Sequence, residues 1–164
     1  MLSQASMKTP VGTLYLISHE HVLLGAGFRS FEDLLARMES QDRAREIKTV
    51  RSIPIVSDLV RDYFAGDLDA LNGIQTRQPG AEFTQAAWKV MRKIPAGKVL
   101  SYAELAKRAG SPDAVRAAGT ACGRNLIAPI IPCHRVVKTG GALGNYGYGL
   151  EVKDFLLRHE GALE

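Results

Sequence analysis

Residues 101–124 read SYAELAKRAGSPDAVRAAGTACGR, and this stretch predicts two helices separated by a short turn. The capping box Ser101-Tyr-Ala-Glu104 starts the first helix, and Gly110 ends it. Ser111-Pro112 then suits the N-cap and first turn of a second helix. Two helices joined in this way form a helix-turn-helix arrangement.

The second predicted helix, residues 113–124, is built mainly from Ala, Gly and Thr, with Arg116 projecting. Small residues permit tight packing against another helix, which is the ordinary structural interpretation. They also let a helix approach a surface closely, and a close-fitting helix with one protruding cation suits the minor groove of DNA. The candidate DNA contacts on this helix are Arg116, Ala117, Gly119 and Thr120.

A linker is predicted near the middle of the chain, at Gln78-Pro79-Gly80. The pattern after it is mostly helical and begins with an amphipathic helix over residues 84–93. We therefore predict an α/β N-terminal domain over residues 1–78 and a mainly helical domain over residues 81–164.

The first half has the pattern of a small α/β unit. Apolar and β-branched runs over residues 13–18 and 22–28 flank His19-Glu20-His21 and predict a β-hairpin. The other expected elements are a helix capped by Ser30 that runs through Met38, a strand over residues 47–50, and a helix over residues 55–64 that ends at Gly66.

The net charge of +4 is distributed unevenly along the chain. Residues 1–80 carry 9 Lys and Arg against 10 Asp and Glu, whereas residues 81–164 carry 12 against 7. A basic half suits a phosphate-backbone partner, although a difference of this size also arises by chance. The charge therefore supports a nucleic-acid partner only weakly.

The cysteine content excludes a disulfide framework, because only Cys122 and Cys133 are present. No Cys-x-x-Cys or His-rich spacing is available for zinc, so we expect reduced thiols and no metal. The N-terminus lacks a signal-type apolar region, and Pro129 and Pro132 interrupt the longest apolar run. We therefore expect neither secretion nor membrane insertion.

Cys133 is the candidate nucleophile, because it lies beside His134 in Pro132-Cys-His-Arg135. An ordinary thiol has a pKa of about 8.5, and lowering it by about two units would make thiolate the majority form at neutral pH. Neighbouring side chains rarely meet on a regular element, so the pair requires an irregular turn or a bridging water. A buried structural cysteine beside a surface histidine is the commoner alternative.

A catalytic histidine also needs an orienting group, which is normally a carboxylate on its other nitrogen. Glu160 follows the last predicted helix and is the candidate. The alternative for Glu160 is an ordinary solvated helix terminus.

Throughout its second half the sequence resembles the O6-alkylguanine-DNA alkyltransferase family. The motifs that carry the resemblance are Ser101-Tyr102, Arg116-Ala-Ala-Gly119, Asn125, Ile131-Pro-Cys-His-Arg-Val-Val137, Gly144-Asn145-Tyr146 and residues 153–161. Their spacing is consistent and highly specific. The first half is similar only in its α/β pattern to the ribonuclease-H-like N-terminal domain of those proteins.

The resemblance implies a stoichiometric suicide reaction in which the Cys133 thiolate takes an alkyl group from O6 of guanine, with O4 of thymine as a second candidate substrate. His134 would accept the thiol proton through water, and Glu160 would hold the imidazole. Asn125 would order the turn around the cysteine. Tyr102 would donate to ring nitrogen N3 as negative charge develops on the departing base.

The damaged nucleotide would have to rotate out of the stack, at a cost of a few kcal/mol. The resemblance implies that Arg116 fills the vacated space. The implied base pocket consists of Val136, Tyr146, Gly147, Tyr148 and Cys122. Tyr148 is bulkier than the small residue of many members, which leaves the acceptance of large adducts such as benzyl groups open.

The implied partner is double-stranded DNA containing O6-alkylguanine, which the protein would contact from the minor groove. We expect a monomeric protein that is cytoplasmic, or nuclear in a eukaryote. We expect no membrane partner, no cofactor and no metal. One rival is a non-catalytic lesion-binding relative, but such proteins lack the reactive cysteine that Cys133 supplies. A helix-turn-helix regulator would need more hydrogen-bonding groups on its recognition helix. A cysteine hydrolase usually separates its Cys and His widely in sequence.

Overall fold

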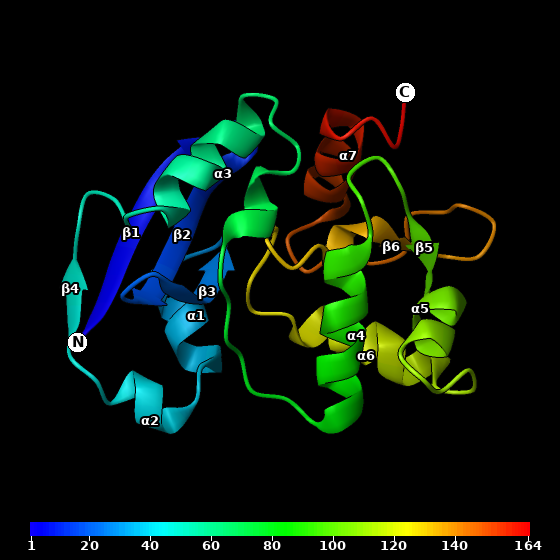
Figure 1. The fold of residues 1–164 in the computed structure, drawn as a ribbon, viewed down its shortest axis with the longest axis horizontal. Helices are drawn as coiled ribbons and strands as arrows, with labels where there is room; N and C mark the ends of the chain where they lie inside the picture. The colour runs from blue at the N-terminus through cyan, green and yellow to red at the C-terminus, as the bar shows by residue number, and fades with distance from the viewer. The chain divides into compact units, whose positions relative to one another are not determined.

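The computed structural model describes residues 1–164, and its contacts divide the chain into two units. The first comprises Met1–Pro79 and Leu126–Ile130, and the second comprises Gly80–Asn125 and Ile131–Glu164. Figure 1 shows strands and helices in the first unit and mainly helices in the second. None of the helices has the length and apolar character needed to span a membrane.

The first unit is built on a four-stranded sheet with the strand order β3-β2-β1-β4. Its strands are β1 (Leu2–Thr9), β2 (Gly12–His19), β3 (Val22–Gly27) and β4 (Ile47–Thr49). The first three are antiparallel neighbours, whereas β4 is parallel to β1. The predicted β2–β3 hairpin is confirmed. Strand β1 was not predicted, because its polar residues hide the alternation that pairing with β2 imposes.

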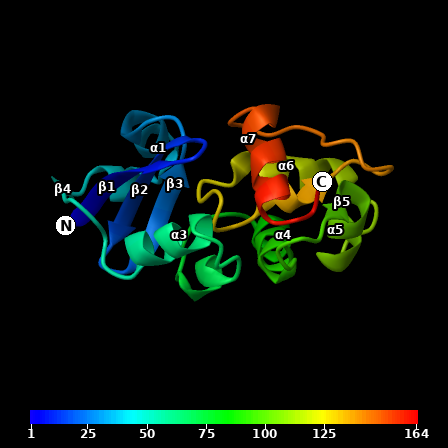
Figure 2. The ribbon, with the colours of Figure 1, turned by 90° about the horizontal axis from the view of Figure 1, so that it is seen from above.

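The helices of the first unit cover both faces of this sheet, with α1 and α3 on opposite sides in Figure 2. They are α1 (Phe31–Arg37), α2 (Ser40–Arg43), α3 (Val56–Phe64) and a 3₁₀ turn, η1 (Ala70–Gly73). The Ser30 side chain accepts the Asp33 N–H at 3.0 Å, which confirms the predicted cap of α1. Fully buried core residues include Leu14, Leu16, Leu34, Val60 and Tyr63.

The outer edge of β3 pairs with a segment from far along the chain, Leu126–Ile130. Ala26 donates to the Leu126 carbonyl at 2.8 Å and accepts from the Ala128 N–H at 3.1 Å. The Gln78 side chain accepts the Leu126 N–H at 3.0 Å. The predicted division at residue 80 assigned this segment to the second domain, because its pairing with β3 has no local sequence signal.

The second unit contains four helices and a small parallel sheet. Its elements are α4 (Glu82–Lys93), β5 (Leu100–Ser101), α5 (Tyr102–Arg108), α6 (Val115–Arg124), η2 (Cys133–Arg135), β6 (Val136–Val137) and α7 (Leu150–His159). Strands β5 and β6 are parallel. Trp88 on α4 donates its indole N–H to the Ala121 carbonyl on α6 at 2.9 Å. This bond holds α6 against α4.

Helix α5 begins with the predicted capping box, because the side chains of Ser101 and Glu104 each accept the other's backbone N–H, at 3.0 and 3.1 Å. The predicted start of the second helix was wrong. Helix α6 begins at Val115, and Ser111 does not cap it. Instead, the Ser111 carbonyl accepts the Ala114 N–H at 2.9 Å in a turn that lengthens the connection.

The mixed sheet with flanking helices and the mainly helical second unit confirm the predicted fold class at that level. The ribonuclease-H-like likeness and the helix-turn-helix assignment stay predictions.

Candidate active site

Cys133 opens the 3₁₀ turn η2 directly after Pro132 and is 7% exposed. Asn125, which ends α6, donates its side-chain amide to the Ile131 carbonyl at 2.7 Å and to the Cys133 sulfur at 3.3 Å. One amide therefore closes the loop between residues 125 and 131 and holds the thiol. A donor at this distance stabilises the anionic form of the sulfur more than the neutral form.

His134 is completely buried, and its two ring nitrogens have different surroundings. Nε2 lies 2.9 Å from Oε2 of Glu160, which ends α7. Nδ1 is buried without a hydrogen-bond partner in the protein. An ionised carboxylate can only accept, so Nε2 carries the hydrogen and Nδ1 keeps its lone pair.

Glu160 is also clamped by Arg135, whose Nε donates to Oε1 at 2.8 Å and whose Nη2 donates to Oε2 at 2.9 Å. The remaining arginine nitrogen, Nη1, donates to the Ile94 carbonyl at 2.5 Å. Two parallel charge-assisted bonds of this kind fix both position and orientation. Arg135 belongs to one of the motifs that carry the resemblance, but no role was predicted for it.

The electrostatics of this trio favour an ionised carboxylate and a neutral imidazole. Burial acts to raise the pKa of Glu160, but the hydrogen bonds and charges of His134 and Arg135 outweigh it and hold that pKa well below its usual range. Burial lowers the pKa of His134, and the attraction of Glu160 does not cancel the effect. His134 is therefore neutral at neutral pH, and its Nδ1 lone pair is available as a proton acceptor.

Lys153 is a second charged residue of α7 that is fully buried. Its ammonium donates to the Val136 carbonyl at 2.7 Å and to the Asn145 carbonyl at 3.1 Å. Burial lowers its pKa. These bonds tie α7 to β6 and to the loop that follows it. Nothing in the local sequence separates Lys153 from an ordinary solvated helix lysine, so this role was missed.

A cavity of about 650 Å³ lies against the Cys133 turn, within the size range of small-molecule sites. From α6 it is lined by four predicted residues, Arg116, Gly119, Thr120 and Cys122. The other predicted residues on its wall are Tyr102, Cys133, Tyr146 and Gly147. The structure thus brings eight of the predicted residues together around one space.

Five further lining residues were not predicted as site residues: Val115, Gly123, Lys138, Gly144 and Asn145. Gly144 has a φ of +77°, and a Cβ there would lie 2.8 Å from the Tyr102 hydroxyl oxygen. Only glycine therefore allows the loop to pass so close to the tyrosine. The Gly144-Asn-Tyr146 motif was the available signal for this wall.

Two predicted pocket residues do not line the cavity. Val136 is fully buried in β6 and contributes its carbonyl to Lys153 instead. Tyr148 packs edge-on against Tyr146, with the ring centres 5.8 Å apart, and does not itself line the cavity. Ala117 is exposed on α6 but also lies outside the cavity wall. His134, Glu160 and Asn125 are buried and line no part of it.

Burial also sets the protonation of two other groups on the wall. It raises the pKa of Tyr102, which keeps the phenol protonated as a donor. It raises the pKa of the Cys122 thiol well above its ordinary value, so this second sulfur remains neutral. No group of three or more His, Cys, Asp or Glu side chains is placed to hold a metal ion.

The chain is similar to known proteins over nearly its whole length. The model of the DNA-binding domain of 6-O-methylguanine DNA methyltransferase matches residues 82–162. The methylated-DNA–protein-cysteine methyltransferase of Salmonella typhimurium is 35% identical, over 99% of this chain and 97% of its own length. The protein of that name from Methanosarcina acetivorans is also 35% identical, over 96% of this chain and 97% of its own.

Among solved structures, that of Mycobacterium tuberculosis OGT in complex with DNA superposes with a TM-score of 0.82 at 32% identity. The match covers 98% of this chain and 93% of that one. The chain belongs to the family of methylated-DNA–protein-cysteine methyltransferases.

Proposed function

We propose that the protein repairs alkylated DNA by moving the alkyl group from O6 of guanine onto Cys133, in a single turnover that consumes the protein. O4 of alkylated thymine is the second candidate substrate. Methyl transfer from DNA to a protein cysteine is the activity of the family. The observation that carries the assignment to Cys133 is its sulfur on the cavity wall, held by Asn125 and followed by the buried His134–Glu160 pair.

Activation of the thiol begins with its proton, which passes through water to the lone pair on His134 Nδ1. The imidazolium that forms keeps its Nε2–H bond to Glu160, and the carboxylate stabilises the new positive charge. Arg135 holds the carboxylate in place, so the imidazole cannot turn away. Burial favours neutral His134 at rest, so proton uptake coincides with formation of the thiolate.

In the transfer step the Cys133 thiolate attacks the alkyl carbon. A sulfur–carbon bond forms as the carbon–O6 bond breaks, and its electron pair moves into the guanine ring. The Tyr102 hydroxyl donates toward N3 and stabilises that charge, and the Gly147 amide donates toward O6. The products are S-alkylcysteine and a guanine anion. The anion becomes guanine by taking up one proton, and His134 releases the proton that it accepted from the thiol, so the protons balance.

Access of the thiol to the alkyl carbon requires an everted nucleotide. We propose that α5 and α6 act as a helix-turn-helix on the minor groove, with Arg116 filling the space that the base leaves and Ala117, Gly119 and Thr120 permitting close approach. The mixed sheet of the first unit suits the ribonuclease-H-like description. We expect the protein to act as a monomer.

Mass spectrometry after incubation with duplex DNA containing O6-methylguanine tests this function. We expect one added methyl group, located on Cys133, and no reaction beyond one equivalent. Cys133→Ala should lose transfer and keep DNA binding, whereas Cys122→Ala, which alters the other sulfur on the wall, should still react. Methylation elsewhere or repeated turnover would refute the proposal. Unmodified protein bound to the lesion would support a non-catalytic lesion sensor.

A further inference from the structure

The cavity wall carries two cations and no carboxylate. Arg116 and Lys138 are the only charged residues that line it, and both are exposed. Neither side chain forms one of the ion pairs of the structure, whereas Arg135 is fully engaged behind the wall. Arg116 is already used by the proposed function, but Lys138 is not.

The backbone fixes Lys138 at the cavity edge. It follows β6 directly, and its N–H donates to the Ala142 carbonyl at 2.8 Å. Its own carbonyl accepts the Gly141 N–H at 3.0 Å. Gly140 and Gly141 have φ values of +92° and +95°, which favour glycine and close the turn. Because the backbone N–H and carbonyl of Lys138 are both hydrogen-bonded within this turn, the position of its Cα at the cavity edge is fixed.

Lys153 differs from Lys138, because its ammonium is bound by groups of the protein itself. Its ammonium is buried and donates to two carbonyls, so it has a structural partner for its charge. Lys138 has an exposed ammonium and no counter-ion. A cation in this setting is available to an anionic ligand that enters the cavity.

The chemistry of an everted nucleotide supplies such an anion. An everted nucleotide keeps the phosphodiesters on either side of its sugar, and each carries one negative charge. Lysine binds phosphate as a compact point charge, and no carboxylate on this wall competes for it. The two cations of the wall attract an anion, and no acidic side chain there weakens this attraction.

We infer that Lys138 binds a DNA phosphodiester next to the everted nucleotide and so holds the damaged base in the cavity. This inference rests on the proposed function and makes Lys138 a substrate-positioning residue. Arg116 occupies the space left in the duplex, while Lys138 retains the nucleotide after it has left. The free base, which has no phosphate, gains nothing from Lys138.

Single-turnover rates for Lys138→Gln and Lys138→Arg test the inference, measured on methylated duplex and on free O6-methylguanine over a range of salt concentrations. For Lys138→Gln we expect a roughly fivefold slower duplex reaction at about 50 mM salt, and a slope of log rate against log salt that is smaller by about one. Lys138→Arg should restore both. The rate with free base should not change.

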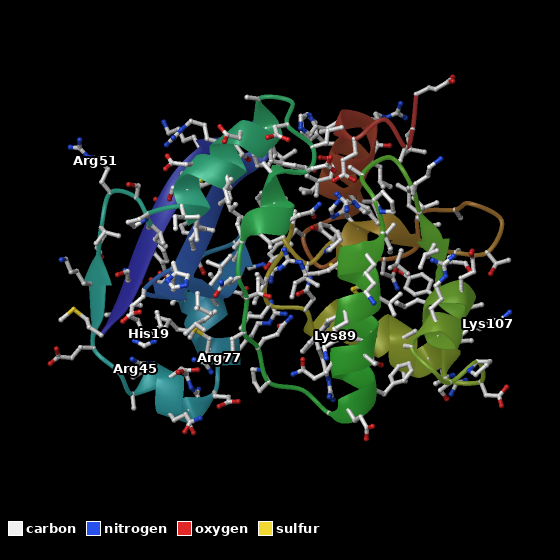
Figure 3. The ribbon with its side chains drawn as sticks, in the orientation of Figure 1. His19, Arg45, Arg51, Arg77, Lys89 and Lys107 are labelled. Atoms are coloured by element: carbon white, nitrogen blue, oxygen red, sulfur yellow. The ribbon has the colours of Figure 1, made fainter.

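Lys89→Gln is the matched control, because Lys89 is an exposed cation of the same unit that projects from α4 in Figure 3 and lies off the cavity wall. An equal loss on duplex and free base would overturn the inference, since Lys138 would then shape the cavity. An unchanged salt slope would overturn it as well. Failure of the proposed function is distinguishable, because wild-type protein would then leave Cys133 unmethylated.

Discussion

The two units of the molecule differ in where most of their ion pairs lie, although the second unit also has an exposed pair, Arg158–Asp154. Every ion pair of the first unit has an arginine that is at least 31% exposed, as in Arg61–Asp58, and Asp42 is the one charged residue that this unit buries. The second unit buries Arg135, Glu160 and His134 together, and it buries Lys153 on carbonyls.

The difference in the burial of ion pairs bears on how each unit is stabilised. Burying an ion pair stabilises a fold little, because desolvation offsets the attraction between the charges. The first unit accordingly relies on apolar packing between its sheet and helices. In the second unit, by contrast, the buried Glu160 and Arg135 fix the orientation of the His134 imidazole, which follows Cys133 in the chain. A cluster of ionisable groups with perturbed pKa values is typical of functional sites.

Removing one buried charge should give the largest contrast between the units. Glu160→Gln leaves the Arg135 guanidinium buried without a counter-ion, and we expect the free energy of unfolding to fall by about 3–5 kcal/mol. Asp58→Asn breaks the exposed pair of the first unit and should cost at most about 1 kcal/mol. Urea unfolding of both variants measures the difference, and equal losses would contradict the comparison.

Acid should destabilise the second unit through the same trio. Below the ordinary His pKa of 6.5, His134 binds a proton in the unfolded chain but not in the folded one. The free energy of unfolding therefore decreases as the pH is lowered. Glu160 adds to the fall below 4.5, because its folded pKa is also lowered. Each group contributes up to about 1.4 kcal/mol per pH unit.

Fluorescence of Trp88, the only tryptophan, reports this pH dependence from within the second unit. His134→Gln should remove the part of the decline that starts near pH 6.5. The exposed His21 offers a control, and His21→Gln should leave the profile intact. A decline near pH 6.5 that persists in His134→Gln would contradict the assignment.

Helix caps should give the smallest effects and should be equal in the two units. Ser30→Ala and Ser101→Ala each remove a side-chain bond to a helix N-terminus and should cost about 1 kcal/mol. Ser111→Ala should change stability by less than about 0.5 kcal/mol, because Ser111 caps no helix. Thermal unfolding of the three variants ranks them, and a loss at Ser111 equal to the others would argue for a cap there.

Local chemistry explains which elements were predictable. The β2–β3 hairpin and the caps at Ser30 and Ser101 depend on residues within a few positions of each other. Strand β1 was missed because its pairing, not its composition, defines it. The start of α6 was misplaced because Ser111 can serve either as a cap or as a turn residue, and its neighbours decide.

The candidate site also contains residues that local sequence predicts and residues whose roles depend on distant contacts. Cys133 and His134 were predicted as site residues from their adjacency, and the motifs around them contain most of the residues that line the cavity. The clamp from Arg135 and the internal bonds of Lys153 were missed, because both depend on burial against distant elements. Val136 and Tyr148 were predicted to line the cavity, but Val136 is buried in the core and Tyr148 packs against Tyr146 without lining the cavity.

The order of residues alone predicts the candidate nucleophile Cys133 with its neighbouring imidazole, the two capped helix starts and the hairpin, since each depends on residues close together in the chain. Folding in three dimensions decides that His134 is neutral, that Glu160 is ionised, and that Leu126–Ile130 lies along β3. Protonation and long-range pairing depend on desolvation and on partners far away in the chain, and these exist only once the chain has packed.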